Sequence, residues 1–308
     1  MNRRRFLSLS MSAAGGLATV PAASLLLGRG DGFEIRPEDI CSSTPRPSRG
    51  LDTALAAEGG LRYEGTHILT HGALRDIARD YKGAVPFIVS GGGCDDGITA
   101  VRRGDAELGG MCCPVEGSRG EGFKSIVIAQ DIKVAVVHPT NRVRDLTRRA
   151  LAEVASGRAA RWSELGGGDR AVALVVREHC PEYREPIRTL LLGEDAWSRK
   201  AILVKTDKEI VETVARFPGG LGLVSWVFAR PLVEAGQLAV LSVDGVDPTA
   251  SAVEAGRYPL HGPLSLVFSA WRDDMRPLFD FIYSPPGRSI IAQSLVPVDR
   301  AQSGYTFG

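Results

Sequence analysis

The sequence predicts an α/β protein built from two lobes. Short apolar runs that favour strands alternate with amphipathic helical segments, which is typical of mostly parallel sheets flanked by helices. The length of 308 residues suits two lobes of roughly 150 residues each. Because the pattern changes in character after residues 138–141, we assign residues 59–137 and 256–308 to the first lobe and residues 138–255 to the second.

The first lobe is predicted to begin with a strand at residues 61–65 and a helix within residues 66–82, where apolar side chains recur at helical spacing. Further strands are expected at residues 85–89, 106–110, 125–129 and 133–138, with a short helix at 98–103. The chain is expected to return to this lobe with a β-rich run at 258–268, helices at 273–283 and 287–294, and a strand at 295–298.

The second lobe is predicted to repeat the alternation of strands and helices. Its strands are expected at residues 171–176, 202–204, 221–225 and 238–243. Its helices are expected at residues 146–156, 181–192 and 207–216, with a single helical turn at 162–165. Pro181 supports the start of the second of these helices because proline is favoured in a first helical turn.

Residues 1–28 are predicted to be a twin-arginine export signal. Arg3, Arg4 and Arg5 precede a mildly apolar stretch at residues 9–27, and small residues near Ala22 could serve as a cleavage site. Ser, Gly and Thr interrupt this stretch, so it lacks the roughly 18 to 20 apolar residues of a membrane span. Residues 29–58 are interpreted as a flexible lead-in. This interpretation places the folded protein in the periplasm or another extracytoplasmic space.

The composition excludes several classes of function. The 37 Lys and Arg residues balance the 36 Asp and Glu residues to a net charge of +1, whereas a nucleic-acid-binding protein would show a basic stripe. The sequence contains no Ser-His-Asp order, paired catalytic carboxylates, P-loop or dinucleotide fingerprint. An enzymatic function is therefore not expected.

A glycine-rich stretch suggests a site for an anion. Ser90 to Gly93 follow an apolar strand and precede a short helix, a geometry that directs backbone N–H groups outward beside a positive helix end. Glycine also lets the backbone approach a bound group closely. Asp95 and Asp96 are best explained as caps of the helix that follows.

Several motifs in collinear order resemble the phosphate-binding protein of ABC phosphate importers (PstS-like). They cover residues 60 to 300, which is most of the chain. They are Ser90-Gly91-Gly92-Gly93, Gly110-Met111 before Pro114, Val137-His138-Pro139-Thr140-Asn141, Trp162-Ser163-Glu164-Leu165, Gly219-Gly220-Leu221-Gly222-Leu223-Val224-Ser225, and Phe281-Ile282-Tyr283-Ser284-Pro285-Pro286-Gly287 with Val296-Pro297-Val298.

The resemblance implies a two-lobed periplasmic-binding-protein fold of type II, whose lobes are joined by crossover strands and close on a small ligand. Such a protein is expected to be a monomer, to deliver its solute to an ABC permease in the membrane, and to need no cofactor. By this resemblance the ligand is phosphate or a related oxyanion.

The resemblance also assigns the ligand-binding loops. They map to Thr66 and His67, to Ser90, Gly92, Gly93, Cys94, Asp95 and Asp96, to Cys112 and Cys113, and to Arg177 and Arg184. The chain departs from the family pattern at three of these loops. Cys94 stands where the family has serine, Cys112 and Cys113 replace a polar pair, and the Ser-Gly-Thr before the arginine is missing.

The cysteines leave three interpretations open. In the first, an exported protein forms disulfides, such as one from Cys94 to Cys112 or Cys113. In the second, thiolates and an imidazole bind a soft ion such as Zn, Cu or arsenite, in a carrier, sensor or redox protein. The residues of that site would be Cys94, Cys112, Cys113, His179 and Cys180. In the third, the loops keep an oxyanion and the cysteines are small neighbours of it.

Overall fold

The computed structural model describes residues 59–177 and 186–306. The predicted export signal and lead-in at residues 1–58 lie outside this range, as do His179, Cys180 and Arg184. Within the described residues, no helix combines the length and the apolar character that crossing a membrane would require.

Two groups of parallel strands form the centre of the fold. In the first group, β1 (Leu61–Gly65) pairs in parallel with β2 (Phe87–Val89) and with β3 (Leu108–Met111). In the second group, β6 (Ala173–Arg177) pairs in parallel with β7 (Ile202–Val204) and β8 (Gly220–Ser225). Each group corresponds to the core of one predicted lobe.

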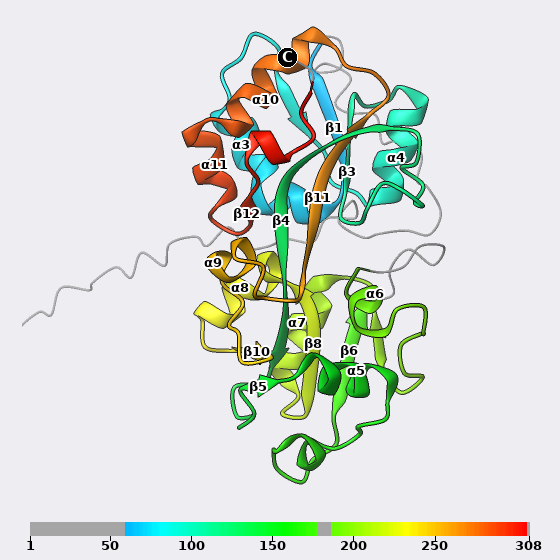
Figure 1. Ribbon diagram of the computed structural model, residues 1–308, viewed down its shortest axis with the longest axis vertical. Coiled ribbons are helices and arrows are strands. Elements are labelled where there is room, and N and C mark those ends of the chain that lie inside the picture. The colour runs from blue at the N-terminus through cyan, green and yellow to red at the C-terminus, as the bar shows by residue number, and fades with distance from the viewer. Residues whose placement is uncertain (1–58, 178–185, 307–308) are drawn as a thin grey trace, which may run out of the picture. The chain divides into compact units, whose positions relative to one another are not determined.

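Two antiparallel strands connect these groups. β11 (His261–Phe268) pairs with β3, and β4 (Lys124–Val137) pairs with β11 along its first part and with β8 along its second. In Figure 1, β4 and β11 run between the half that contains β1 and β3 and the half that contains β6 and β8. The strand order is therefore β2-β1-β3-β11-β4-β8-β6-β7.

Short strands complete the sheets. β12 (Val296–Pro297) and β9 (Ala239–Val240) both pair with β4, so the last strand of the chain returns to the first half as predicted. β5 (Asp145–Leu146) and β10 (Ser242–Val243) form a separate parallel pair. The predicted strand at residues 238–243 is therefore divided between two partners.

The helices cover both halves. Those of the first half are α2 (His67–Leu69), a π-helical turn at Thr70–Leu74, α3 (Arg75–Asp80), α4 (Cys94–Arg103), α10 (Arg276–Tyr283) and α11 (Pro285–Ile291). Those of the second half are α5 (Arg148–Ser156), α6 (Pro186–Leu192), α7 (Asp207–Arg216), α8 (Trp226–Glu234) and α9 (Ala250–Glu254). Short 3-10 turns lie at Trp162–Leu165, Asp273–Met275 and Arg300–Gln302. The sequence analysis did not predict α8 or α9.

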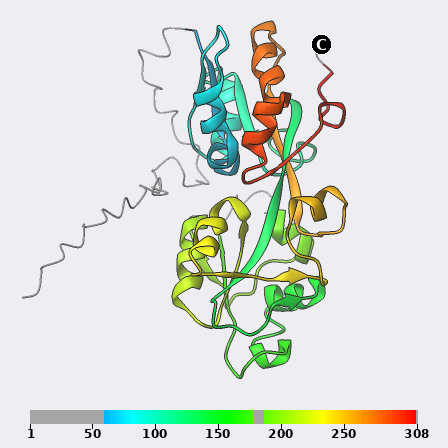
Figure 2. The same ribbon diagram turned by 90° about the vertical axis from the view of Figure 1, so that its left-hand side faces the viewer.

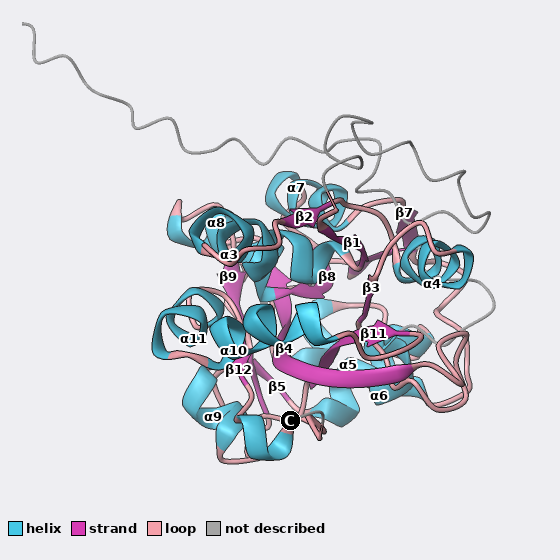
Figure 3. Ribbon diagram, turned by 90° about the horizontal axis from the view of Figure 1, so that it is seen from above, coloured by secondary structure: helices cyan, strands magenta, loops and turns pink. Residues whose placement is uncertain are grey.

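The C-terminal helices return to the first half of the molecule. Figure 2 shows α10 and α11 beside the early helix α3. Seen from above in Figure 3, α4 and α11 lie on opposite sides of β1 and β3. Of these two helices, α4 packs against β1 and β3, whereas α11 packs against α3, α10 and β12.

Two predicted boundaries are wrong. The strands predicted at 125–129 and 133–138 are one continuous strand, β4, because Asp131 and Lys133 pair with each other rather than ending the strand. The helix predicted at 98–103 begins at Cys94, because the Asp96 carboxylate accepts a hydrogen bond from Gly93 N at 3.2 Å and caps the helix.

Glycines allow the first turn of α4 to pack directly against the strands. A Cβ atom at Gly97 would lie 2.3 Å from Glu64 O, and one at Gly109 would lie 3.2 Å from Gly97 O. The obstacles are backbone atoms, which cannot move aside as a side chain can. The close contact of α4 with β1 and β3 therefore depends on these glycines.

We expect the substitution Gly97→Ala to lower the free energy of unfolding by about 1–3 kcal/mol, because the added methyl group overpacks the helix against β1. The measurement is urea denaturation followed by circular dichroism. Gly168→Ala is the matched control, since a Cβ atom there meets nothing within 4 Å. Equal unfolding midpoints for the two variants would show that the helix does not depend on this contact.

Candidate functional site

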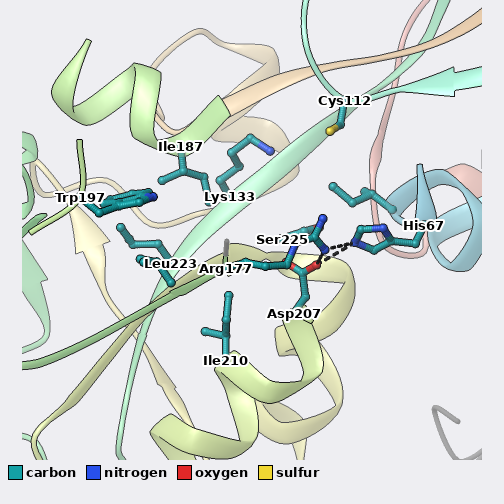
Figure 4. A pocket seen from close by; sticks show the side chains of 12 residues that line it. His67, Cys112, Lys133, Arg177, Ile187, Trp197, Asp207, Ile210, Leu223 and Ser225 are labelled. Atoms are coloured by element: carbon teal, nitrogen blue, oxygen red, sulfur yellow. Dashed lines mark hydrogen bonds and ion pairs between the residues drawn. The ribbon is translucent and has the colours of Figure 1, made fainter. Parts of the chain in front are cut away.

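A small cavity lies where side chains of the two halves meet (Figure 4). Its polar lining residues are His67, Cys112, Lys133, Arg177, Asp207 and Ser225. Its volume of ≈ 30 Å³ is enough for about two water molecules at ~10–15 Å³ each. The cavity lies beyond the carboxyl ends of β1, β3 and β6, the edge at which parallel sheets bind ligands.

His67, Arg177 and Asp207 form the centre of the cavity. Arg177 is the last residue of β6 and is 7% exposed, and its Nη1 donates a hydrogen bond to Asp207 Oδ2. Asp207 begins α7, where the positive helix end stabilises a carboxylate. His67 Nε2 lies 2.7 Å from the same Asp207 oxygen and 2.6 Å from Arg177 Nη1. These contacts connect α2 in the first half to β6 and α7 in the second.

The two contacts of His67 Nε2 exclude each other at any one moment. This nitrogen donates to Asp207 only when it carries a proton, and it accepts from Arg177 only when it does not. Which of the two hydrogen bonds forms therefore depends on which ring nitrogen of His67 carries a proton. In both arrangements Arg177 continues to donate to Asp207.

A second polar cluster lies on the connecting strand β4. Lys133 Nζ is 2.7 Å from Asp131 Oδ2, and Ser225 Oγ donates to Asp131 Oδ1 at 2.6 Å. Burial raises the pKa of Asp131, while Lys133 and Ser225 act in the opposite direction. Asp131 is fully buried and Lys133 is 3% exposed, so this ion pair is part of the interior and borders the cavity.

Two buried polar side-chain atoms lie at the end of β1. Thr66 Oγ1 and His67 Nδ1 have no hydrogen-bond partner within the described residues. Buried polar groups in folded proteins are nearly always hydrogen-bonded, so such exceptions need an explanation. A ligand with hydrogen-bonding oxygens near α2 would supply the missing partners.

The structure brings together some of the predicted ligand residues. His67, Cys112 and Arg177 line the same cavity, as the sequence analysis expected of its ligand loops. Cys94 lies beside Cys112, with 3.4 Å between the two Sγ atoms. Their roles toward a ligand stay predictions.

Other predicted residues serve the local structure. Ser90 N donates to Tyr63 O at 2.9 Å and continues the strand pairing. Gly92 has a φ of +142°, which favours glycine, and Gly93 precedes α4. Asp95 forms an ion pair with Arg119 at 3.2 Å. The expectation that Asp96 is a helix cap is confirmed by its bond to Gly93 N.

The structure gives no support to the alternative of a soft-metal site for Zn or Cu. Within the described residues, no three His, Cys, Asp or Glu side chains gather to hold a metal ion. Cys94 and Cys112 are close together, but Cys113 packs against the apolar cluster formed by Ile98, Met111, Val115 and Val267. The other proposed ligands, His179 and Cys180, lie outside the described residues.

Several cavity residues were not predicted from the sequence. Lys133 and Ser225 were read only as parts of strands, and Asp207 only as the start of a helix. A charged residue inside an apolar strand was the available signal for Lys133, because lysine is rarely buried without a partner. Trp197, which was not among the predicted ligand residues, also lines the cavity.

Comparison with known proteins identifies relatives of the chain. Residues 66–284 match the family described as a PBP superfamily domain. Two curated relatives named phosphate-binding protein PstS, from Borreliella burgdorferi and Bacillus subtilis, are 26% identical over 182 residues and 27% identical over 175 residues. Each match spans 56% of this chain but only 65% and 57% of the relative. The predicted resemblance to PstS-like phosphate-binding proteins is confirmed.

Solved structures confirm the predicted fold class. A proposed phosphate ABC transporter substrate-binding protein with bound phosphate, from Clostridium perfringens, superposes with a TM-score of 0.69. It is 22% identical and the match covers 78% of this chain and 100% of that chain. An ABC-type phosphate transport receptor from Vibrio cholerae superposes with a TM-score of 0.62 at 20% identity, covering 77% and 99%. The fold is thus the two-lobed type II binding-protein fold.

Glu64, on β1 near the glycine loop, is expected to make stability depend on pH. Its pKa is raised from an ordinary 4.5 to about 7, mainly by burial and to a smaller extent by the nearby Asp96 and Asp105. Between these two values the unfolded chain has released a proton that the folded protein retains. The contribution of Glu64 to stability therefore falls as the pH rises from about 4.5 to about 7.

The test compares the urea midpoints of wild type, Glu64→Gln and Glu116→Gln at pH 5 and pH 8. Glu64→Gln should be stabilised relative to wild type at pH 8 more than at pH 5. The exposed Glu116 is the matched control, and its variant should follow the wild-type pH dependence. A parallel pH dependence for all three proteins would contradict the assignment.

Proposed function

Because the chain belongs to the PBP superfamily, we propose that it is a solute-binding protein of an ABC importer and that it binds phosphate or a related oxyanion. The observation that carries the proposal is the cavity around Arg177, where two cations and a histidine from both halves converge. The names of the curated relatives and of the structural neighbours support the choice of phosphate.

The chemistry of the cavity suits an oxyanion. The planar guanidinium of Arg177 can donate two parallel hydrogen bonds to phosphate oxygens, and Lys133 adds a compact positive charge. The residues of the glycine loop before α4 are not among those that line this cavity. The buried donors and acceptors at Thr66 and His67 would complete the coordination.

Binding requires the two halves to separate first. A cavity of ≈ 30 Å³ holds about two waters, whereas a phosphate ion has five heavy atoms. The His67–Asp207 contact, which joins the two halves, has to open for the anion to enter. This requirement agrees with a fold whose lobes move about connecting strands.

The wider role follows from the same proposal. The protein would hand its solute to a permease in the membrane, would catalyse no reaction, and would act as a monomer outside the cytoplasm. Export by the twin-arginine route stays a prediction from residues 1–28. The lobe boundaries given above likewise stay predictions.

We expect Arg177→Leu to weaken phosphate binding by about a hundredfold or more, because a charge-assisted hydrogen bond contributes ~1.5–3 kcal/mol and Arg177 can make two. Isothermal titration of the purified protein with inorganic phosphate measures this loss. Arg216→Leu, at the exposed end of α7, is the matched control and should bind like wild type. Failure of wild type to bind phosphate would refute the proposed ligand, and equal binding by Arg177→Leu would refute the site.

We also expect Asp207→Asn to bind phosphate more tightly, by about fivefold, because an anion must otherwise displace this carboxylate from Arg177. The same titration measures the change, with Asp169→Asn as a control at an exposed carboxylate. Weaker binding by Asp207→Asn would instead mean that Asp207 accepts a proton from the bound anion.

A further inference from the structure

Cys94 and Cys112 lie side by side although they are 18 positions apart in sequence. Their Sγ atoms are 3.4 Å apart, and the residues are only 6% and 4% exposed. Cys94 is the first residue of α4, and Cys112 directly follows β3. The juxtaposition results from the glycine contacts that hold α4 against β1 and β3.

We propose that Cys94 and Cys112 form a reversible dithiol–disulfide site beside the cavity, and that formation of the disulfide weakens anion binding. The disulfide itself is independent of the proposed function, whereas its effect on binding rests on that function. The site gives a shared role to Cys94 and Cys112, two of the three cysteines in the described loops that depart from the family pattern.

The geometry favours this pair over the alternatives. The separation of 3.4 Å exceeds a disulfide bond of ~2.05 Å by about 1.4 Å, a gap that a modest rotation of the two side chains can close. Cys113 is turned toward the apolar cluster of Ile98 and Met111 and is partly exposed. The sequence alone left Cys112 and Cys113 as equal partners for Cys94, and the structure selects Cys112.

The cavity provides access to the site. Cys112 is among the cavity-lining residues, and Cys94 is not (Figure 4). An oxidant that enters between the separated halves therefore meets Cys112 first. Cys112 adds in small part to the raised pKa of Asp131, whose main cause is burial.

The oxidant is a disulfide, either a small molecule such as glutathione disulfide or a protein that donates disulfides. The Cys112 thiolate attacks one sulfur of this disulfide, whose S–S bond breaks and releases one thiolate. The Cys94 thiolate then attacks Cys112 Sγ in the mixed disulfide and releases the second thiolate. The two cysteine protons end on the two released thiols, so the protein loses two electrons and the oxidant gains them.

The bond would alter the proposed anion site from the side of α4. It would draw the sulfur of Cys112, which lines the cavity, toward Cys94 at the start of α4 and so change the wall of the cavity. Loss of one well-placed hydrogen bond to the anion corresponds to a change in affinity of up to about tenfold, which equals about 1.4 kcal/mol. We therefore expect phosphate binding to weaken about tenfold on oxidation.

The first experiment treats the full chain, reduced and then exposed to glutathione disulfide, and maps its tryptic peptides by mass spectrometry. Trypsin places Cys94 in residues 83–102 and Cys112 with Cys113 in residues 104–119. Wild type and Cys113→Ser should yield the linked peptide pair, and Cys112→Ser should not. Absence of the link in wild type, or its persistence in Cys112→Ser, would overturn the site.

The second experiment titrates inorganic phosphate into the same proteins before oxidation, after oxidation and after reduction with dithiothreitol. Oxidised wild type and Cys113→Ser should bind about tenfold more weakly than their reduced forms and recover on reduction. Cys112→Ser should not respond to the oxidant. Unchanged affinity in the cross-linked protein would overturn the control of binding. If the reduced protein does not bind phosphate, the proposed function fails, and the peptide map still decides the disulfide.

Discussion

A single strand, β4, belongs to both halves of the sheet, and the cavity depends on this constraint. Asp131 faces β11 in the first half, and two residues later Lys133 faces β8 in the second. The ion pair between Asp131 and Lys133, together with Ser225, lies where β4 changes its pairing partner from β11 to β8. Loss of either partner would leave a buried charge, which costs far more than an exposed ion pair contributes. The strand is therefore tied to its position by polar contacts as well as by packing.

The fold was predictable because most of its elements follow local patterns. The strands β1 and β7 and the helix α7 have the bounds that apolar periodicity predicted. β4 was divided in two because charged residues inside an apolar run normally mark a loop. Only the tertiary structure shows that the Asp131 carboxylate accepts a hydrogen bond from the Lys133 ammonium group. A sequence pattern alone could therefore not have joined the two predicted strands into one.

The cavity was predictable in part, for a related physical reason. His67, Cys112 and Arg177 follow or end strands of parallel groups, and the ends of such strands meet at one edge. Lys133 lies in the middle of a strand and Trp197 in a loop, so their positions depend on how the halves meet. The side-by-side position of Cys94 and Cys112 depends on glycines that permit close backbone packing. The spacing of the two cysteines in the sequence does not predict this contact.

The charges of the cavity imply that the proposed anion binding is an exchange of ion-pair partners. Arg177 and Lys133 already pair with Asp207 and Asp131, so the formal charges of these four residues cancel. The binding free energy of an incoming anion is therefore only the difference between its own contacts with the cations and the contacts that it replaces. The replaceable partner is Asp207, since it lies at the start of a helix with 14% of its side chain exposed, whereas Asp131 is fully buried. In the proposed binding, opening of the halves and release of Arg177 would be parts of one event, because the oxygen of Asp207 that accepts from Arg177 also contacts His67 across the cavity.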